Sequence, residues 1–145
     1  MDDTLANALD ILPHGPEFRF LDRLVSLEPG KEGVGEYLVR GDEPFLRGHF
    51  PGAPLFPGVL LVEAVAQLAG VVAQNDPTVP ALPGLKLAAL RGVRILGSAR
   101  PGEVLRLEAR ITGRLGAVVQ AHGQALVAGR LVLTAEMTLG SDATA

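Results

Sequence analysis

The longest apolar stretch of the chain, residues 59–73, most constrains how it can fold, because only Glu63 and Gln67 interrupt it. Pro57-Gly58 precedes it and Asn75-Asp76-Pro77 follows it, and these are signals for helix ends. The pattern predicts one helix over residues 58–74, which spans about 25 Å at 1.5 Å per residue. A helix that is apolar nearly all round is buried, and this stretch is too short and too polar to cross a bilayer.

The rest of the chain favours β-structure. Apolar and charged residues alternate over 103–112 and again over 130–140, which is typical of half-buried strands. Further strands are predicted over 18–27, 33–40, 85–96 (a pair or one bent strand) and 117–127, with a turn at 113–116 and a hairpin at 128–129. The first fifteen or so residues form a short helix or arm, and the tail after Gly140 is expected to fray. The economical architecture is α+β, an antiparallel sheet curled around one central helix.

The length of 145 residues, with 48% hydrophobic residues, predicts a single domain over 1–145. A helix that is apolar all round needs cover on every side, and one sheet of this size covers about half of it. A second copy of the chain is the obvious source of the remaining cover, so we expect a homo-oligomer.

Charge and composition exclude several classes of function. The net charge is −3 and the basic residues are scattered, which argues against nucleic-acid binding. The chain has no cysteine, and its three histidines lack the spacing of metal ligands, so we expect neither a metal nor a cofactor. The N-terminus is acidic and does not resemble a signal peptide, so we expect a cytoplasmic location and no membrane role.

Glu63, Gln67 and Gln74 are the polar residues of the predicted helix, and with Gly70 they fall on one stripe. A carboxylate in so apolar a helix needs a partner or a proton. One interpretation is that Glu63 hydrogen-bonds Gln67 or loop amides and only fixes the helix. The other is that burial lets Glu63 hold a proton near neutral pH and act as an acid.

His49 lies in an irregular stretch, residues 41–58, that contains four prolines and four glycines. It is either a loop histidine bonded to backbone or a general base, since imidazole titrates near neutrality. Pro57-Gly58 is either simply a helix start or a site where free amides polarise a thioester carbonyl. Together these features predict removal of water from a 3-hydroxyacyl thioester. His49 takes the α-proton, amides at Gly58 stabilise the carbonyl oxygen, and Glu63 protonates the departing hydroxyl.

The other two histidines are expected to be outside this chemistry. His14 lies between Pro13 and Gly15 and is interpreted as structural. His122 shares the polar face of a predicted strand with Gln120 and Gln124, so we expect it to face solvent.

Residues 48–67, Gly-His-Phe-Pro-Gly-Ala-Pro-Leu-Phe-Pro-Gly-Val-Leu-Leu-Val-Glu-Ala-Val-Ala-Gln, closely resemble the (3R)-hydroxyacyl-acyl carrier protein dehydratases of bacterial fatty acid synthesis. Residues 11–14, 20–23 and 42–45 also resemble motifs of this family. The resemblance implies the hot-dog fold, an acyl carrier protein thioester as substrate, and a homodimer, which in this family is commonly assembled further into a trimer of dimers. It also implies a hydro-lyase without cofactor, whose paired histidine and glutamate come from different subunits.

The family's histidine and glutamate correspond to His49 and Glu63, and its carbonyl-polarising amide corresponds to Gly58. We further expect Phe50, Pro57 and Gln67 to contact substrate. A glutamate at this position resembles the dehydratase-only branch of the family.

The chain departs from the family pattern at residues 15–18, where no tyrosine follows His14, and at 93–103, which lack an aromatic, proline-rich run. Two other functions therefore stay open: a hot-dog thioesterase, which would not need His49, and a non-catalytic binder of acyl thioesters. The paired His49 and Glu63 favour the dehydratase. An acidic carrier would bind basic groups, for which Lys86, Arg91, Arg94 and Arg100 are candidates.

Overall fold

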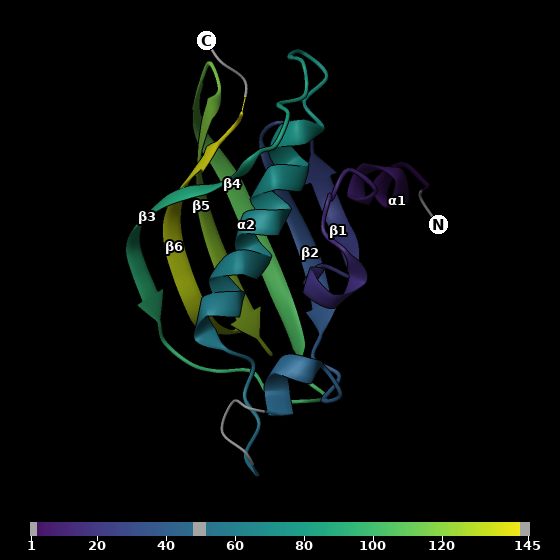
Figure 1. The fold of residues 1–145 in the computed structure, drawn as a ribbon, viewed down its shortest axis with the longest axis vertical. Coiled ribbons are helices and arrows are strands. Elements are labelled where there is room, and N and C mark those ends of the chain that lie inside the picture. The colour runs from purple at the N-terminus through teal and green to yellow at the C-terminus, as the bar shows by residue number, and fades with distance from the viewer. Residues whose placement is uncertain (1–2, 48–51, 143–145) are drawn as a thin grey trace.

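One long helix, α2 (Gly58–Gln74), lies across one face of a six-stranded antiparallel sheet (Figure 1). The computed structural model describes residues 3–47 and 52–142. The remaining elements are α1 (Asp3–Leu9), the short 3-10 helices η1 (Pro16–Phe18) and η2 (Pro44–Arg47), and the strands β1 (Arg23–Glu28), β2 (Glu32–Leu38), β3 (Lys86–Ile95), β4 (Val104–Leu115), β5 (Val118–Val127) and β6 (Arg130–Gly140). The predicted α+β hot-dog architecture is confirmed.

The helix α2 has the bounds that its flanking residues predict. Pro57 occupies the N-cap with extended backbone angles, φ −58° and ψ 135°, and its carbonyl accepts the N–H of Leu61 at 3.2 Å. At the other end, the Asn75 side chain donates to the carbonyl oxygens of Val71 at 2.8 Å and Ala8 at 3.1 Å. Asn75 therefore closes the helix and attaches it to α1. No helix in the described ranges is both long enough and apolar enough to span a membrane.

The sheet has the order β1-β2-β4-β5-β6-β3, which leaves β1 and β3 as its edges. Leu105, Leu107 and Ala109 of β4 are buried, while the residues between them are more exposed. This period-2 alternation places the apolar side of the sheet against α2. The apolar residues of α2 therefore meet a continuous apolar surface, and the core lies between the helix and the sheet.

The N-terminal segment covers a further side of α2, which the sequence did not predict. Phe20 and Leu21 are each 1% exposed and belong to the core around the helix. The helix residues left partly open include Glu63, Gly70 and Gln74, which belong to the polar stripe. We expected a second copy of the chain to supply the cover that the sheet leaves, but the N-terminal segment of the same chain supplies part of it.

Two local predictions were also wrong. No strand begins at Phe18, because Pro16 starts η1 and β1 begins only at Arg23. The turn predicted at 113–116 is mostly strand, because β4 continues to Leu115. The register between β4 and β5 shifts between Ile111 and Gly113, so Gly113 lies within the strand. The chain reverses at Gly116, which has φ 57°. The hairpin at 128–129 is confirmed, with positive φ at both residues.

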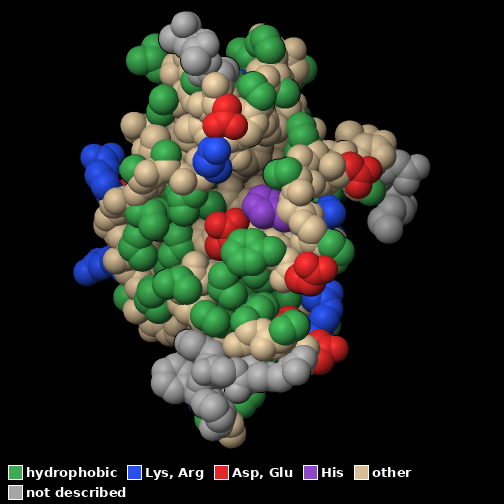
Figure 2. All heavy atoms as spheres, viewed as in Figure 1, with side chains coloured by type: hydrophobic (Ala, Val, Ile, Leu, Met, Phe, Trp, Pro, Cys, Tyr) green, Lys and Arg blue, Asp and Glu red, His purple; other side chains and the backbone are tan. Residues whose placement is uncertain are grey.

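The strand β3 is one bent strand with two register irregularities, and among the described strands it pairs with β6 alone. Its exposed apolar residues are Leu90, Val93 and Ile95, followed by Leu96 at 55% exposure. Val59, in the first turn of α2, is 73% exposed. Figure 2 shows hydrophobic side chains gathered on this face of the molecule. An edge strand with free backbone groups and apolar side chains is suited to pairing with another chain.

An aromatic cluster joins the start of the sheet to the chain ahead of α2. The ring of Phe20 lies within 6 Å of the rings of Phe18, Phe45, Phe56 and Tyr37, mostly edge to face. Such edge-to-face contacts add to the free energy of burying the rings. The cluster therefore fixes η2 and the segment before Pro57 against β2.

The hydroxyl of Tyr37 donates to Oε2 of the buried Glu43 at 2.7 Å. Burial, followed by this hydrogen bond, raises the pKa of Tyr37. Burial opposes the charge on Glu43, but the N–H of Arg40, the Tyr37 hydroxyl and the N–H of Gly41 outweigh it and lower the pKa of Glu43. The carboxylate thereby ties the backbone after β2 to the aromatic cluster.

Candidate active site

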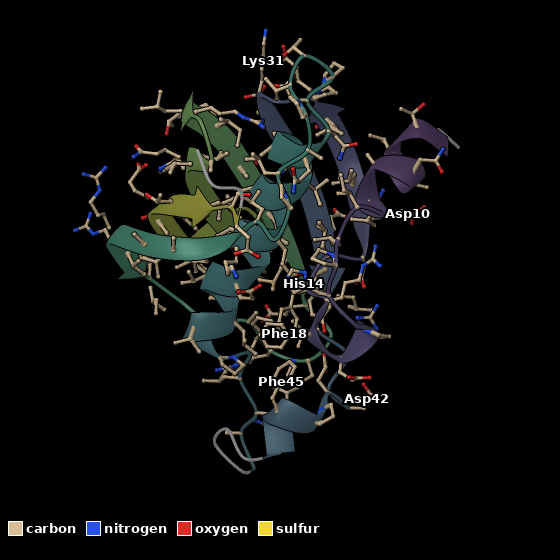
Figure 3. All side chains as sticks on the ribbon, turned by 45° about the horizontal axis from the view of Figure 1, so that its top comes forward. Asp10, His14, Phe18, Lys31, Asp42 and Phe45 are labelled. Atoms are coloured by element: carbon tan, nitrogen blue, oxygen red, sulfur yellow. The ribbon has the colours of Figure 1, made fainter. Side chains whose placement is uncertain are left out.

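The polar stripe of α2 lines a cavity of about 480 Å³. Glu63, Gln67, Gly70 and Gln74 form its helical wall. The opposite walls come from residues 11–14 and from 84–87, at the beginning of β3. Figure 3 shows His14 lying in front of α2, with Phe18 next to it. The cavity combines apolar side chains with a few polar groups, which is typical of a small-molecule site.

Gln67 fixes one oxygen of Glu63. Its Oε1 accepts the N–H of Phe20 at 2.8 Å, and its Nε2 donates to the carbonyl of Phe18 at 2.9 Å. The same Nε2 donates to Oε2 of Glu63 at 3.1 Å. The Glu63–Gln67 hydrogen bond that we predicted as the structural interpretation is therefore present. Glu63 nevertheless borders the cavity, with 23% of its side chain exposed, so it is also available to a ligand.

His14 is the residue that sequence reasoning missed. Its Nε2 lies 3.4 Å from Oε2 of Glu63, in the same cavity. Its ring stacks on Phe18 with a centroid distance of 6.3 Å and an interplanar angle of 24°. We had interpreted His14 as structural from its Pro-His-Gly setting. The available signal was its place in the motif of residues 11–14, which resembles the dehydratase family.

The other end of the cavity is closed by a loop bound to the helix. Gln74 donates to the carbonyl of Leu82 at 2.6 Å and accepts the N–H of Leu82 at 2.8 Å. An ideal Cβ on Gly70, between Gln67 and Gln74, would meet no heavy atom within 4 Å. Gly70 therefore leaves open space in the middle of the helical wall.

The role predicted for Gly58, a backbone amide at the start of α2 that polarises a carbonyl, stays a prediction. The first N–H groups of a helix have no intrahelical acceptor, which makes such amides candidates for binding a ligand. A Cβ on Gly58 would lie 2.8 Å from Cδ1 of Ile95. A side chain at position 58 would displace the end of the Ile95 side chain, so the glycine lets β3 pack closely against the helix start. Pro57 holds the N-cap, and its contact with substrate stays a prediction.

His49 and Phe50, predicted as a catalytic and a substrate-binding residue, lie outside the described residues. Just before the start of α2, the N–H of Phe56 donates to the carbonyl of Ala99 at 2.8 Å. The chain just before Pro57 is thus fixed to the segment that follows β3.

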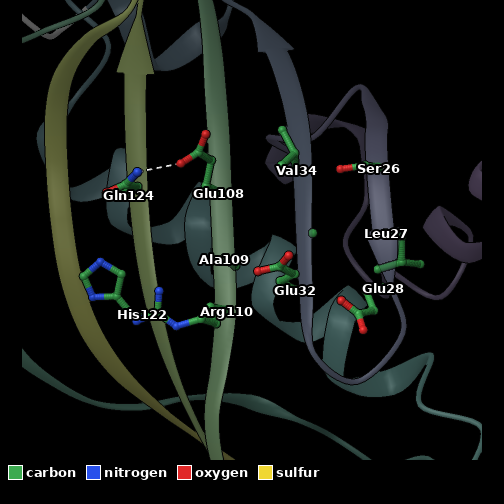
Figure 4. Close-up of a pocket in the computed structure, with 11 residues that line it drawn as sticks. Ser26, Leu27, Glu28, Glu32, Val34, Glu108, Ala109, Arg110, His122 and Gln124 are labelled. Atoms are coloured by element: carbon green, nitrogen blue, oxygen red, sulfur yellow. Dashed lines mark hydrogen bonds between the residues drawn. The ribbon is translucent and has the colours of Figure 1, made fainter.

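A second cavity, of about 470 Å³, lies on the opposite face of the sheet (Figure 4). A Cβ on Gly123 would meet the side chain of Val65 of α2, so the neighbouring His122 and Gln124 point away from the helix. Gln124 donates to Glu108 at 2.5 Å, and Nδ1 of His122 lies 2.7 Å from Glu136. The predicted polar face is confirmed, but His122 is paired and 27% exposed rather than simply solvated.

Among the described residues, no group of three or more histidine, cysteine or acidic side chains could hold a metal ion.

Comparison with known proteins places this site in a family. Residues 12–136 match the FabA-like domain. The chain is 38% identical to the 3-hydroxyacyl-[acyl-carrier-protein] dehydratase FabZ of Chloroflexus aggregans, covering 92% of each chain. It is 42% identical to the FabZ of Caldanaerobacter subterraneus, covering 88% of this chain and 89% of that one. The chain therefore belongs to the FabA-like family, as its resemblance to the dehydratases predicted.

Solved structures show the same fold at lower identity. The dehydratase heterocomplex ApeI:P from Xenorhabdus doucetiae superposes with a TM-score of 0.79 at 18% identity, covering 97% of this chain and 92% of that chain. A hypothetical thioesterase with coenzyme A from Streptococcus pneumoniae has a TM-score of 0.62 at 13% identity, covering 83% and 85%.

Proposed function

We propose that this chain dehydrates (3R)-3-hydroxyacyl thioesters of acyl carrier protein to trans-2-enoyl thioesters in fatty acid synthesis. This is the activity in the names of its relatives at about 40% identity over most of the chain. The observation that carries the proposal is the setting of Glu63 on the core helix. Gln67 binds one oxygen of its carboxyl, and the side chain borders a cavity whose walls are largely apolar. The enzyme is thus a hydro-lyase that needs no oxidant or reductant.

In the proposed reaction, His49 of one subunit removes a proton from the carbon next to the thioester carbonyl. Amides at the start of α2, including that of Gly58, stabilise the oxygen that gains negative charge. The partner subunit's Glu63, in its protonated form, gives its proton to the β-hydroxyl, which leaves as water. The C–O bond electrons leave with the water, and the double bond forms between the α- and β-carbons.

The experiment is to follow enoyl-thioester formation from a short 3-hydroxyacyl thioester, with detection of free thiol in the same reaction. We expect enoyl product without thiol, and loss of turnover in both His49→Ala and Glu63→Gln. Release of thiol without enoyl product would identify a thioesterase instead. Turnover at the wild-type rate in both variants would overturn the assignment.

We propose that two copies of the chain pair through the edge of β3. This strand has free backbone groups on one side and carries exposed Leu90, Val93 and Ile95. Pairing there would bury these side chains and the exposed Val59 of the neighbouring helix start. Light scattering should give a mass of two chains or a multiple of two. Val93→Lys is expected to shift it toward one chain, and an unchanged mass would contradict this interface.

The acyl carrier protein is proposed to dock near the basic side chains of β3. Arg91 and Arg94 lie on this strand, and an acidic carrier is attracted by such a patch. Charge reversal of Arg94 to Glu is expected to raise KM for the carrier-bound substrate while leaving KM for a pantetheine thioester unchanged. Arg110→Glu, in the cleft lined by β1, β2, β4 and β5, is the control. A rise in both KM values for Arg94→Glu would mean that the residue acts on the active site itself.

A further inference from the structure

The two oxygens of Glu63 have different surroundings. Oε2 receives the N–H of Gln67 at 3.1 Å and lies 3.4 Å from Nε2 of His14. The orientation of the Gln67 amide is fixed, because its oxygen accepts a backbone N–H from Phe20 and its nitrogen donates to the carbonyl of Phe18. Gln67 therefore presents a donor to Oε2, and Oε2 acts as an acceptor.

The proposed reaction uses Glu63 in its protonated form. In that form, the oxygen that accepts from Gln67 is the carbonyl-like oxygen, and the proton lies on Oε1. Oε1 is accordingly the atom that can pass a proton to a substrate in the cavity, while Oε2 is the anchored end of the group.

The tautomer of His14 follows from the same contacts. Facing an acceptor oxygen, its Nε2 carries the hydrogen, which leaves Nδ1 as the bare nitrogen. Nδ1 is buried and has no hydrogen-bond partner in the described part of the chain. The ring is held from the side by Phe18, whose carbonyl is bound to Gln67. His14, Phe18 and Gln67 thus form one connected frame around Oε2.

We propose that His14 is a positioning residue for Glu63: its Nε2–H, together with Gln67, holds Oε2 so that Oε1 faces the departing hydroxyl. This inference rests on the proposed dehydratase function. It assigns His14 no contact with substrate and no proton transfer of its own. The 3.4 Å separation is longer than an ideal hydrogen bond and is expected to shorten when substrate fills the cavity.

The test separates the N–H of His14 from its ring. His14→Gln keeps an N–H at the position of Nε2 but loses the ring, whereas His14→Phe keeps the stacking on Phe18 but has no N–H. We expect His14→Phe to lower kcat by about 10- to 100-fold with little change in KM, because the proton donor is no longer aligned. We expect His14→Gln to retain kcat within about threefold of wild type, since the amide supplies the same donor. Urea denaturation of both variants checks that the fold is intact.

Three outcomes would overturn the inference. Wild-type kcat in His14→Phe would show that the ring serves packing alone. Equal loss of kcat in both variants, with folding intact, would show that the imidazole itself carries a proton. A rise in KM without a change in kcat would place His14 in binding. Other results would refute the proposed dehydratase function itself: the wild-type protein would form no enoyl product, or Glu63→Gln would remain active.

Discussion

The two cavities of this protein contain the same kinds of side chain and differ in their surroundings. The α2 cavity has Glu63 with His14 and Gln67, and the outer cleft has Glu108 with Gln124 beside the pair of His122 and Glu136. Their volumes are nearly equal, at about 480 and 470 Å³. A histidine, a glutamate and a glutamine near one another therefore do not define a site.

The difference lies in what the polar groups are attached to. In the α2 cavity, Gln67 is tied to the backbone of Phe18 and Phe20, so the carboxyl of Glu63 has a fixed direction. On the outer face, flexible side chains bond mainly to each other, including Arg106 to Glu108 at 2.8 Å. Water competes with such exposed pairs, which contribute little free energy. If this difference in attachment is correct, equivalent substitutions in the two cavities should have unequal effects.

The first prediction compares Glu63 of the α2 cavity with Glu136, the partner of His122 on the outer face of the sheet. Glu63→Gln should lower kcat by about 10²- to 10⁴-fold, because the amide still accepts the Gln67 N–H but has no proton to give. Glu136→Gln, on the outer face, should leave kcat within about twofold, as surface changes away from a site usually do. Steady-state kinetics on one short substrate measures both. Comparable losses of kcat in the two variants would contradict a special role for Glu63.

The second prediction concerns the space beside Gly70. Gly70→Leu should lower kcat/KM for long acyl substrates by at least about tenfold, because the new side chain fills the cavity, and short substrates should be spared. Helix stability should rise by up to about 1 kcal/mol, since leucine is a better helix former than glycine. Ser26→Leu, in the outer cleft, is the control and should leave the chain-length profile unchanged. A parallel shift of the profile in both variants would count against an acyl site on α2.

The third prediction compares the two glutamines. Gln67→Leu leaves the buried N–H of Phe20 and the carbonyl of Phe18 without their partner and should lower the free energy of unfolding by about 1–3 kcal/mol. Gln124→Leu removes a bond on the sheet surface and should change it by no more than about 0.5 kcal/mol. Urea denaturation at pH 7 measures both. An equal cost in the two variants would mean that the outer network is as well fixed as the inner one.

The fourth and smallest effect is the pH dependence of the outer cleft. The hydrogen bond from Arg106, against the opposing effect of burial and with help from Gln124, lowers the pKa of Glu108. In the unfolded chain, glutamate binds its proton near pH 4.3. The folded chain binds it only at lower pH, so the stabilisation is present above about pH 4.3 and is lost as pH falls through the folded value.

Glu108→Gln should therefore flatten the acid side of the stability curve, by less than about 1 kcal/mol, and the difference should shrink in 1 M NaCl. Urea midpoints between pH 3 and 7 provide the measurement. An acid limb identical to that of the wild type at low salt would contradict the prediction.

The sequence predicts the fold and half of the site because those depend on local signals. Pro57-Gly58 and Asn75-Asp76-Pro77 determine the ends of α2, and the helical period places Glu63 and Gln67 on one stripe. The contact of His14 with Glu63 joins residues far apart in the chain and depends on the path of the N-terminal segment over α2. The close approach of Ile95 of β3 to Gly58 is likewise a long-range contact that no local pattern reveals.

The aromatic cluster has a practical consequence for spectroscopy. Tyr37 is the only tyrosine of the chain, and there is no tryptophan, so ultraviolet emission and most near-ultraviolet absorption come from a single ring. That ring is 3% exposed, and its hydroxyl is bound to Glu43, beside η2. Fluorescence of the unlabelled protein will therefore report on the junction between β2 and the chain that leads to α2, without the signal averaging that several chromophores would cause.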